Sequence, residues 1–254
     1  MKILSPLRAF DEIKPLSDAG ADQFYCGLLS DNEINDRPNT ATFNFQTIEE
    51  VEKANNFALK NNKDIYLAIN GVGGNIEKSI LQARAAEKIG LKGIIISNLF
   101  LMNKIDELNL NLEIFASSVL GCINNESIEF LKRFGIKGIH LPDQLSIQEI
   151  TDIKKANDDI ELSVFDEHCY SLESFCRFGH IHNNRYVLPC CGFREENKFG
   201  ERINKRFSEE FMLKKISGLE KTGIDIVKIV GRNHSLKQKL YSVKLIRGIL
   251  EKSD

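Results

Sequence analysis

The sequence predicts a single α/β domain of the (β/α)8 barrel type. Eight short apolar runs recur along the 254 residues, helical stretches lie between most of them, and the runs are continuous rather than alternating with polar residues. Continuous apolar strands are typical of a parallel sheet covered by helices, and eight such units close into a barrel. An open, doubly wound parallel sheet is the alternative fold that fits the same pattern.

The expected strands share a short length and a content of β-branched and aromatic residues. In chain order they are residues 3–4, 23–25, 65–69, 93–96, 112–116, 138–141, 161–165 and 226–230. The expected helices show apolar residues at intervals of three or four positions. They are residues 7–19, 47–61, 76–89, 99–106, 124–134, 146–156, 208–222 and 236–252.

A recurring sequence motif marks the connections from helix to strand. It reads EKIGLKGIII around Gly90, KRFGIKGIHL around Gly135 and EKTGIDIVKI around Gly223. Each copy has a basic residue near a helix end, a glycine, a short link and an apolar run. This residue pattern is typical of an αβ loop with glycine at the helix end. The motif therefore indicates repeated units of a helix followed by a strand.

Composition favours one domain over residues 1–254, because 42% of the residues are hydrophobic and no Pro-, Gly- or Ser-rich break divides the chain. The net charge of -2 disfavours nucleic acid as a partner without excluding it. No apolar stretch has the length of a membrane span or of a secretion signal. We therefore expect a cytoplasmic protein with no membrane span.

Four of the six cysteines lie in one segment that directly follows the expected strand 161–165. In a chain without a secretion signal, clustered thiols favour a metal site over disulfides. The spacing is not the repeated CxxC of structural zinc and suits an iron-sulfur cluster at least as well; zinc is the alternative, and inert or redox-active cysteines are a further one. We expect residues 166–207 to be a cluster-binding insertion, with the metal ligands Cys169, Cys176, Cys190 and Cys191.

The fourth ligand is open in this interpretation. Adjacent residues of an extended chain point to opposite faces, so Cys190 and Cys191 reach one cluster only if the backbone turns between them. Pro189 and Gly192 permit such a turn. Without it, the fourth ligand falls to Cys26, to one of the neighbouring histidines or to substrate.

Further candidates lie where the expected strands end, at the face of the barrel that we call the mouth. Chemistry in barrels of this type occurs at the carboxyl ends of the strands. Basic side chains there bind anionic groups, and a salt bridge to Glu161 is the alternative role for those on the last strand. The loop after residue 70 could hold an anion through backbone amides, or be a simple Asn-Gly turn. The long loop at residues 28–46 is also expected to be functional. The expected substrate-binding residues are Asn70, Lys228 and Arg232 at strand ends, and Arg37 and Asn44 in this loop.

Three stretches resemble the collagenase-like peptidase family, the U-thirty-two group. Glu161, Cys169 and Cys176 fall on the glutamate and first two cysteines of its signature. GIDIVKIVGR at residues 223–232 is similar to its strand ending in KIEGR, and GADQFYCG at residues 20–27 is similar to its GADAVYFGG. The family's third and fourth cysteines, three residues apart, are replaced here by an adjacent pair.

The resemblance implies a barrel-like fold, a 4Fe-4S cluster and a role in oxygen-independent hydroxylation, of ubiquinone precursors or of RNA bases. The length and near-neutral charge are similar to those of the ubiquinone-type members, and a related subunit could complete a heterodimer. The family's name implies a peptidase, with a metallopeptidase as one form, although no nucleophile and base stand at a recognisable spacing. A noncatalytic partner with a structural cluster is the third interpretation, and the substrate, small or macromolecular, is not specified.

Overall fold

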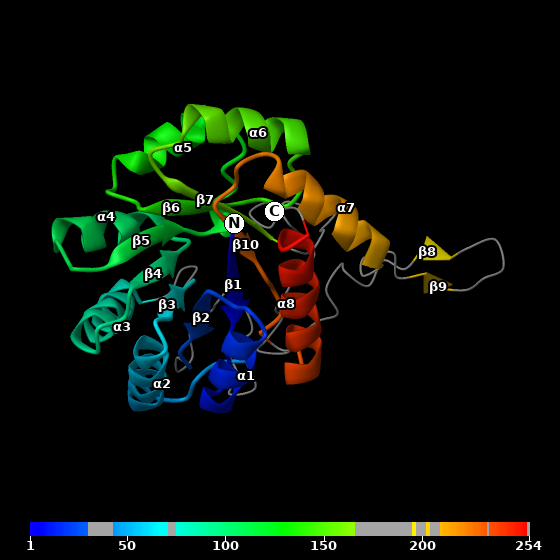
Figure 1. Ribbon diagram of the computed structural model, residues 1–254. Helices are drawn as coiled ribbons and strands as arrows, with labels where there is room; N and C mark the ends of the chain where they lie inside the picture. The colour runs from blue at the N-terminus through cyan, green and yellow to red at the C-terminus, as the bar shows by residue number, and fades with distance from the viewer. Residues whose placement is uncertain are drawn as a thin grey trace.

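The computed structural model describes residues 1–29, 43–70, 75–165, 195–196, 202–203, 209–232 and 234–252. Eight parallel strands close into a barrel in the order β1-β10-β7-β6-β5-β4-β3-β2, and helices surround it on the outside (Figure 1). The predicted (β/α)8 fold is confirmed. The open doubly wound sheet is wrong, because the first and last strands pair with each other, Leu4 lying opposite Lys228.

The barrel strands match the predicted runs closely. They are β1 (Lys2–Pro6), β2 (Gln23–Gly27), β3 (Asp64–Ile69), β4 (Gly93–Ile96), β5 (Glu113–Ala116), β6 (Gly138–Leu141), β7 (Glu161–Phe165) and β10 (Ile226–Lys228). Two short strands, β8 (Glu195–Glu196) and β9 (Arg202–Ile203), pair in antiparallel fashion. The apolar runs do not predict this pair, which lies within the expected insertion at 166–207.

The helices also match, except that the first expected helix divides into a 3-10 turn, η1 (Phe10–Glu12), and α1 (Ile13–Asp18). The others are α2 (Ile48–Lys60), α3 (Ile76–Lys88), α4 (Leu99–Glu107), α5 (Asn125–Lys132), α6 (Ile147–Ala156), α7 (Glu209–Glu220) and α8 (Leu236–Leu250). Gly90, Gly135 and Gly223 have φ of 69°, 60° and 76°, which confirms their place at helix ends. No helix in these described stretches combines the length and apolar content needed to cross a bilayer.

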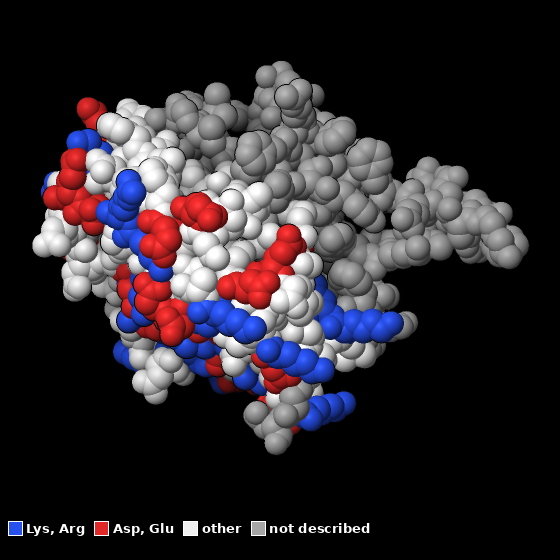
Figure 2. All heavy atoms as spheres, turned by 90° about the horizontal axis from the view of Figure 1, so that it is seen from above, with Lys and Arg blue, Asp and Glu red and all other residues white. Residues whose placement is uncertain are grey.

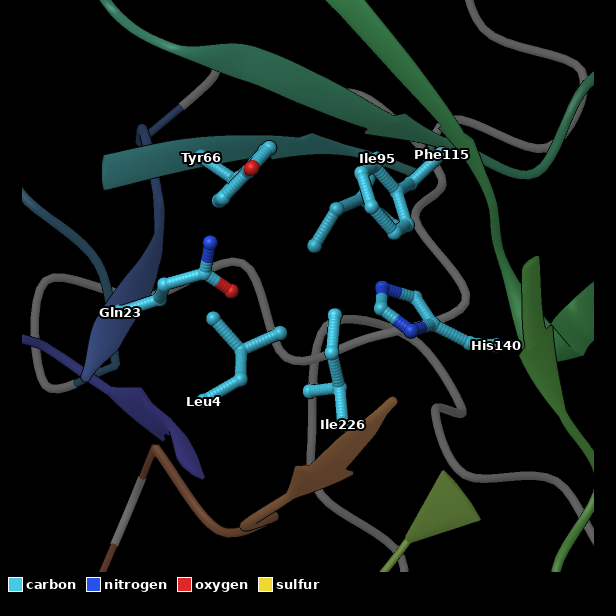
Figure 3. Close-up of a pocket in the computed structure, with 7 residues that line it drawn as sticks. All are labelled: Leu4, Gln23, Tyr66, Ile95, Phe115, His140 and Ile226. Carbon is cyan, nitrogen blue, oxygen red and sulfur yellow. The ribbon is translucent and has the colours of Figure 1, made fainter. Parts of the chain in front are cut away.

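The core has two layers, because strand side chains alternate between the two faces of the sheet. One layer packs between the sheet and the helices. The other fills the barrel interior and includes Leu4, Tyr25, Tyr66, Ile95, Phe115 and Ile226. Figure 3 shows Gln23 and His140 reaching into this interior from opposite sides. The space between these side chains is too small for a water molecule, so the interior is a packed core rather than a binding cavity.

Charged residues close the amino end of the barrel. The Tyr66 hydroxyl donates to Glu113 at 2.8 Å, and Lys92 pairs with the same carboxylate at 3.1 Å. Glu161 lies 3.6 Å from both Lys2 and Lys137. This end lies opposite the mouth, so the network contributes to stability rather than to chemistry.

Two side chains of the last helix make polar contacts with the first β-α unit. Lys239 of α8 donates to Glu12 of η1 at 2.7 Å, and both side chains are buried, at 0% and 4% exposure. Further along α8, Arg247 donates to the Gly20 carbonyl at 2.6 Å and pairs with Asp22. These contacts brace the joint where β1 meets β10.

Candidate functional site

The mouth consists of the residues at and just after the carboxyl ends of the eight barrel strands. On β3, Tyr66 and Ala68 lie on the inward side, so Asn70 continues that side beyond the strand end. By the same alternation Ser97 follows Ile95 of β4, and Ser117 follows Phe115 of β5. This side of the mouth is therefore lined by neutral hydrogen-bonding groups.

A basic group stands on the other side of the mouth. The Arg232 guanidinium donates to Asn44 Oδ1, and a Cβ added at Gly27 would overlap both groups. Asn44 is held there because the Phe45 amide donates to the Gly27 carbonyl at 3.0 Å. Glycine at the end of β2 is thus required for the close approach of this pair. Two residues predicted from separate parts of the sequence, Asn44 and Arg232, lie together.

Lys228 lies just below this pair, inside the barrel. Its ammonium group is 4.5 Å from the centroid of the Tyr25 ring, and the residue is only 6% exposed. The Tyr25 hydroxyl donates to the Ile229 carbonyl at 3.1 Å, which fixes the ring under the cation. Cation–π attraction is strongest where water is excluded. The Tyr25 ring therefore fixes the positive charge of Lys228 at the floor of the mouth.

The alternative that Lys228 or Arg232 forms a salt bridge with Glu161 is wrong. Lys228 lies opposite Phe165 in the register, at the carboxyl end of β7. Glu161 begins the same strand and pairs at the amino end of the barrel. The length of β7 therefore separates the Lys228 ammonium from the Glu161 carboxylate along the barrel axis. Lys228 and Arg232 remain part of the mouth.

A histidine and a serine that the sequence did not single out meet in the barrel interior, below the mouth. His140 Nδ1 and the Ser163 hydroxyl share a hydrogen bond, and the hydroxyl also donates to the Ile139 carbonyl at 3.4 Å. Both residues are buried, at 1% and 0% exposure. The available signal was a polar residue at an inward position of an otherwise apolar strand, in GIHL and ELSVF.

Burial holds the pKa of His140 well below its usual value, and the nearby Lys228 charge lowers it further. The folded protein therefore takes up fewer protons at this site than the unfolded chain as the pH falls. Stability linked to His140 is fully present above the unfolded pKa near 6.5 and is lost below it. The imidazole is neutral throughout the physiological range.

Between pH 7.5 and 5.5 we expect His140 to account for about 1.4 kcal/mol of lost unfolding free energy. Urea unfolding of the wild type and of His140→Gln at both pH values measures this difference. The variant should show the shallower decline, since glutamine does not titrate. Equal declines in the two proteins would contradict the assignment of this acid sensitivity to His140.

The two described cysteines are packed residues. Cys26 is wholly buried on the outer side of β2, among the residues between sheet and helices, and burial raises the pKa of its thiol to about 12. Cys122 is 3% exposed, and burial raises its pKa to about 11. Both therefore hold neutral thiols, whereas a metal ligand is a thiolate. Cys26 points away from the mouth, which weakens it as a fourth ligand.

Several predicted residues lie outside the described part of the chain. These are Arg37 and the four expected metal ligands, Cys169, Cys176, Cys190 and Cys191. Within the described ranges, no group of three or more His, Cys, Asp or Glu side chains is arranged to hold a metal ion. The structure does show where the cysteine segment begins. The preceding strand, β7, ends at Phe165, which lies opposite Lys228.

Acidic and basic side chains are interspersed over the described residues on the face seen in Figure 2. That pattern agrees with the net charge of -2. A surface that binds nucleic acid through its phosphates presents a field of one sign, which this face does not.

The chain is similar to proteins of one named family. The model described as Peptidase family U32 matches residues 8–253. A curated relative, an uncharacterized protease of Methanocaldococcus jannaschii, is 32% identical over 174 residues, which cover 65% of this chain and 40% of the relative. The chain thus spans well under half of that relative's length.

Solved structures support the fold. A U32 peptidase aligns with a TM-score of 0.57 at 14% identity, over 91% of this chain and 93% of that one. A tryptophan synthase from Mycobacterium tuberculosis aligns with a TM-score of 0.56 at 10% identity, over 98% and 91%. At such identities the likeness concerns the barrel fold alone.

Proposed function

The chain belongs to Peptidase family U32, and from this premise we propose that it is an iron-sulfur enzyme that hydroxylates a substrate at the barrel mouth without molecular oxygen. The observation that carries the proposal is the position of β7. The strand that precedes four cysteines ends at the mouth, in register with Lys228 of β10. The only thiols in the described part of the chain, those of Cys26 and Cys122, are buried and neutral. The expected cluster ligands are therefore Cys169, Cys176, Cys190 and Cys191.

The described residues suit a cluster at this place. A cluster held by thiolates carries negative charge, and its potential depends on the charges and hydrogen bonds around it. Lys228 and Arg232 supply positive charge on the adjoining side of the mouth. A bound cluster would supply electron transfer, and the barrel residues would bind and orient the substrate beside it.

Protein purified without oxygen is expected to be brown and to contain iron and acid-labile sulfide in similar amounts. The reason is the thiol density at one strand end. Metal analysis and absorption spectroscopy of the full chain measure this. Stoichiometric zinc in place of iron would contradict the proposal and favour the zinc alternative.

A peptidase is the second candidate, because the family and the Methanocaldococcus relative carry that name. The described residues that best fit a nucleophile and a base are Ser163 and His140, which share a hydrogen bond. Their burial weighs against this role, since a scissile bond must reach the hydroxyl. Cleavage of a fluorogenic peptide mixture by the wild type, and its loss in Ser163→Ala, would favour the peptidase over the hydroxylase.

A further inference from the structure

The last helix, α8, differs from the other helices in its charge. It contains four basic residues, Lys237, Lys239, Lys244 and Arg247, and no acidic residue in its 15 positions. Each of the helices α1 to α7 contains at least one aspartate or glutamate. Because α8 contributes +4 and the whole chain has a net charge of -2, the other residues together contribute -6. Positive charge is therefore concentrated on one element of an otherwise acidic chain.

The basic residues of α8 divide between two sides of the helix. Two of them face inward and pair with carboxylates of the first β-α unit, as described above. Lys237 and Lys244 are instead exposed, and within the described ranges neither forms a salt bridge. The fold therefore does not use the charges of Lys237 and Lys244.

The two exposed lysines belong to one stripe along the helix. Lys237, Tyr241 and Lys244 recur at intervals of four and three positions, so they share one side of the helix, and we call them the α8 stripe. Tyr241 is 55% exposed. Figure 1 shows α8 on the outside of the barrel, beside α7. Gly248 continues this side, and a Cβ added there would meet no atom within 4 Å. The α8 stripe is therefore an open surface with an aromatic ring between two cations.

Helix stability does not account for the α8 stripe. Lys237 lies in the first turn of α8, where the helix macrodipole is positive and favours acidic residues. The helices α2, α3, α5 and α6 all have a glutamate in their first turn. Tyrosine is enriched in protein interfaces, and exposed charges around it steer a partner of opposite sign. These properties indicate an interaction surface.

We propose that the α8 stripe docks a small acidic protein of the ferredoxin type, which carries single electrons. Encounters between redox proteins bury little surface and are steered by complementary charge, which suits one helix side with two lysines around a tyrosine. The choice of an electron carrier rests on the proposed function, because a cluster that transfers electrons exchanges them with an outside protein. One electron passes from the reduced carrier to the oxidised cluster, and no bond is made or broken.

The position of α8 suits electron transfer to a cluster at the mouth. Its N-cap, Ser235, follows Arg232 by three residues, so Lys237 lies at the mouth end of the helix. The preceding strand, β10, pairs with β7, and Lys228 lies opposite Phe165. The cysteine segment begins directly after Phe165. A carrier on the α8 stripe would therefore lie on the same sector of the barrel as the proposed cluster.

An acidic protein fits the α8 stripe better than a nucleic acid or a membrane does. A nucleic acid presents many phosphates and is held by a broad basic field, whereas the residues outside α8 sum to a negative charge. A helix that lies on a membrane has several large apolar side chains on its lipid side, and the α8 stripe has only Tyr241. A compact acidic protein needs to contact only the helix.

The test is anaerobic titration calorimetry of the full-length protein with a plant-type 2Fe-2S ferredoxin, which is acidic. Cytochrome c, a basic carrier of single electrons, is the control probe. We expect saturable binding of ferredoxin that weakens as salt is added, because salt screens exposed charges. Cytochrome c should not bind. No binding of ferredoxin, or equal binding of cytochrome c, would overturn the inference.

Variants test whether the α8 stripe is the docking surface. Lys237→Glu combined with Lys244→Glu should weaken ferredoxin binding by about tenfold or more, since like charges then face each other. Lys78→Glu combined with Arg84→Glu is the matched control, because it makes the same change in net charge with two exposed residues of α3. The control should bind ferredoxin nearly as the wild type does. Equal weakening in both proteins, or none in either, would overturn the inference.

Tyr241→Ala tests the contact rather than the charge. It should weaken ferredoxin binding by about tenfold through faster dissociation, while the dependence on salt stays that of the wild type. Duplex RNA and phosphatidylserine vesicles are titrated in the same way. Tighter binding of either one than of ferredoxin, lost in the double lysine variant, would overturn the inference in favour of that ligand.

Stability separates recognition from structure. Lys237→Glu replaces a cation at the positive end of the helix by an anion, so its melting temperature should match or exceed that of the wild type. A fall of several degrees would show that Lys237 has a structural role and would overturn the inference.

Electron transfer tests the kind of partner. Stopped-flow mixing of reduced ferredoxin with the oxidised iron-loaded protein should bleach the visible absorption of the cluster, more slowly in the double lysine variant. Binding without transfer would overturn the choice of an electron carrier. Iron is measured in every sample, and calorimetry does not require it. Absence of iron from the wild type therefore contradicts the proposed function, whereas full iron without ferredoxin binding contradicts the docking surface.

Discussion

Replacing Cys169 or Cys176 with alanine is expected to remove nearly all the iron from anaerobically purified protein. Both cysteines follow a strand that ends at the mouth, and both are expected ligands from the sequence resemblance to the family's signature. Removing one thiolate from a four-ligand cluster exposes an iron and destabilises the whole assembly. Iron and sulfide analysis, with the absorption spectrum, measures the loss.

Cys122→Ala and Cys26→Ala are the controls for this experiment. Their thiols are buried, and burial raises their pKa values to about 11 and about 12, so neither serves readily as a thiolate. Both variants should keep the iron content of the wild type. An equal iron loss in all the alanine variants would show that the ligand assignment is wrong.

Variants of the adjacent residues Cys190 and Cys191 identify the fourth ligand of the cluster. If the chain turns between Cys190 and Cys191, serine at either position should perturb the cluster's EPR spectrum. A full and unperturbed cluster in one of the two variants would rule out four thiolates from this segment. An iron left open in that way could bind substrate directly as a Lewis acid.

Glu12→Gln is expected to lower the free energy of unfolding by about 3–5 kcal/mol. Glu12 accepts from Lys239 at 2.7 Å and from the Arg8 side chain at 3.1 Å, in a nearly water-free setting. Without the carboxylate, the Lys239 ammonium is left buried and uncompensated. Burial already lowers the pKa of Lys239, which indicates how costly the charge is at this place. Urea unfolding measures the change.

Two control variants test whether the loss of stability comes from the buried charge. Glu12→Gln combined with Lys239→Met removes both charges and should recover most of the loss, since an apolar pair of similar volume is tolerated. Asp18→Asn breaks the exposed Lys14–Asp18 pair, at 71% and 63% exposure, and should change stability by no more than about 0.5 kcal/mol. A similar loss in Asp18→Asn and Glu12→Gln would contradict the explanation by burial.

The fold was predictable because its signals are local. Continuous apolar runs and glycines at helix ends depend only on neighbouring residues, and Gly90, Gly135 and Gly223 adopt the expected positive φ. The break in the first helix also has a local signal that the periodicity did not take into account. Residues 7–19 were expected as one helix, but Pro15 has no amide hydrogen and lies in the first turn of α1, and the residues before α1 form η1.

The site was predictable only in part, because its geometry depends on register. The sequence led to Asn70, Lys228 and Arg232 at strand ends and to Asn44 in a long loop, and all four are at the mouth. It did not reveal that Cys26 faces outward, since one position along a strand reverses the face. His140 and Ser163 were missed because their pairing joins two strands whose alignment no local pattern specifies.

The joint between β1 and β10 also bears on how the protein folds. Leu4 and Lys228 become neighbours only when nearly the whole chain is in place, so the last pairing closes the longest loop in the molecule. Lys228 and Arg232 arrive at the mouth with that same event. An intermediate that lacks the joint would have most of its strands and helices but no substrate-binding cations. The ability to bind substrate is therefore expected to appear last during refolding, in step with closure of the ring.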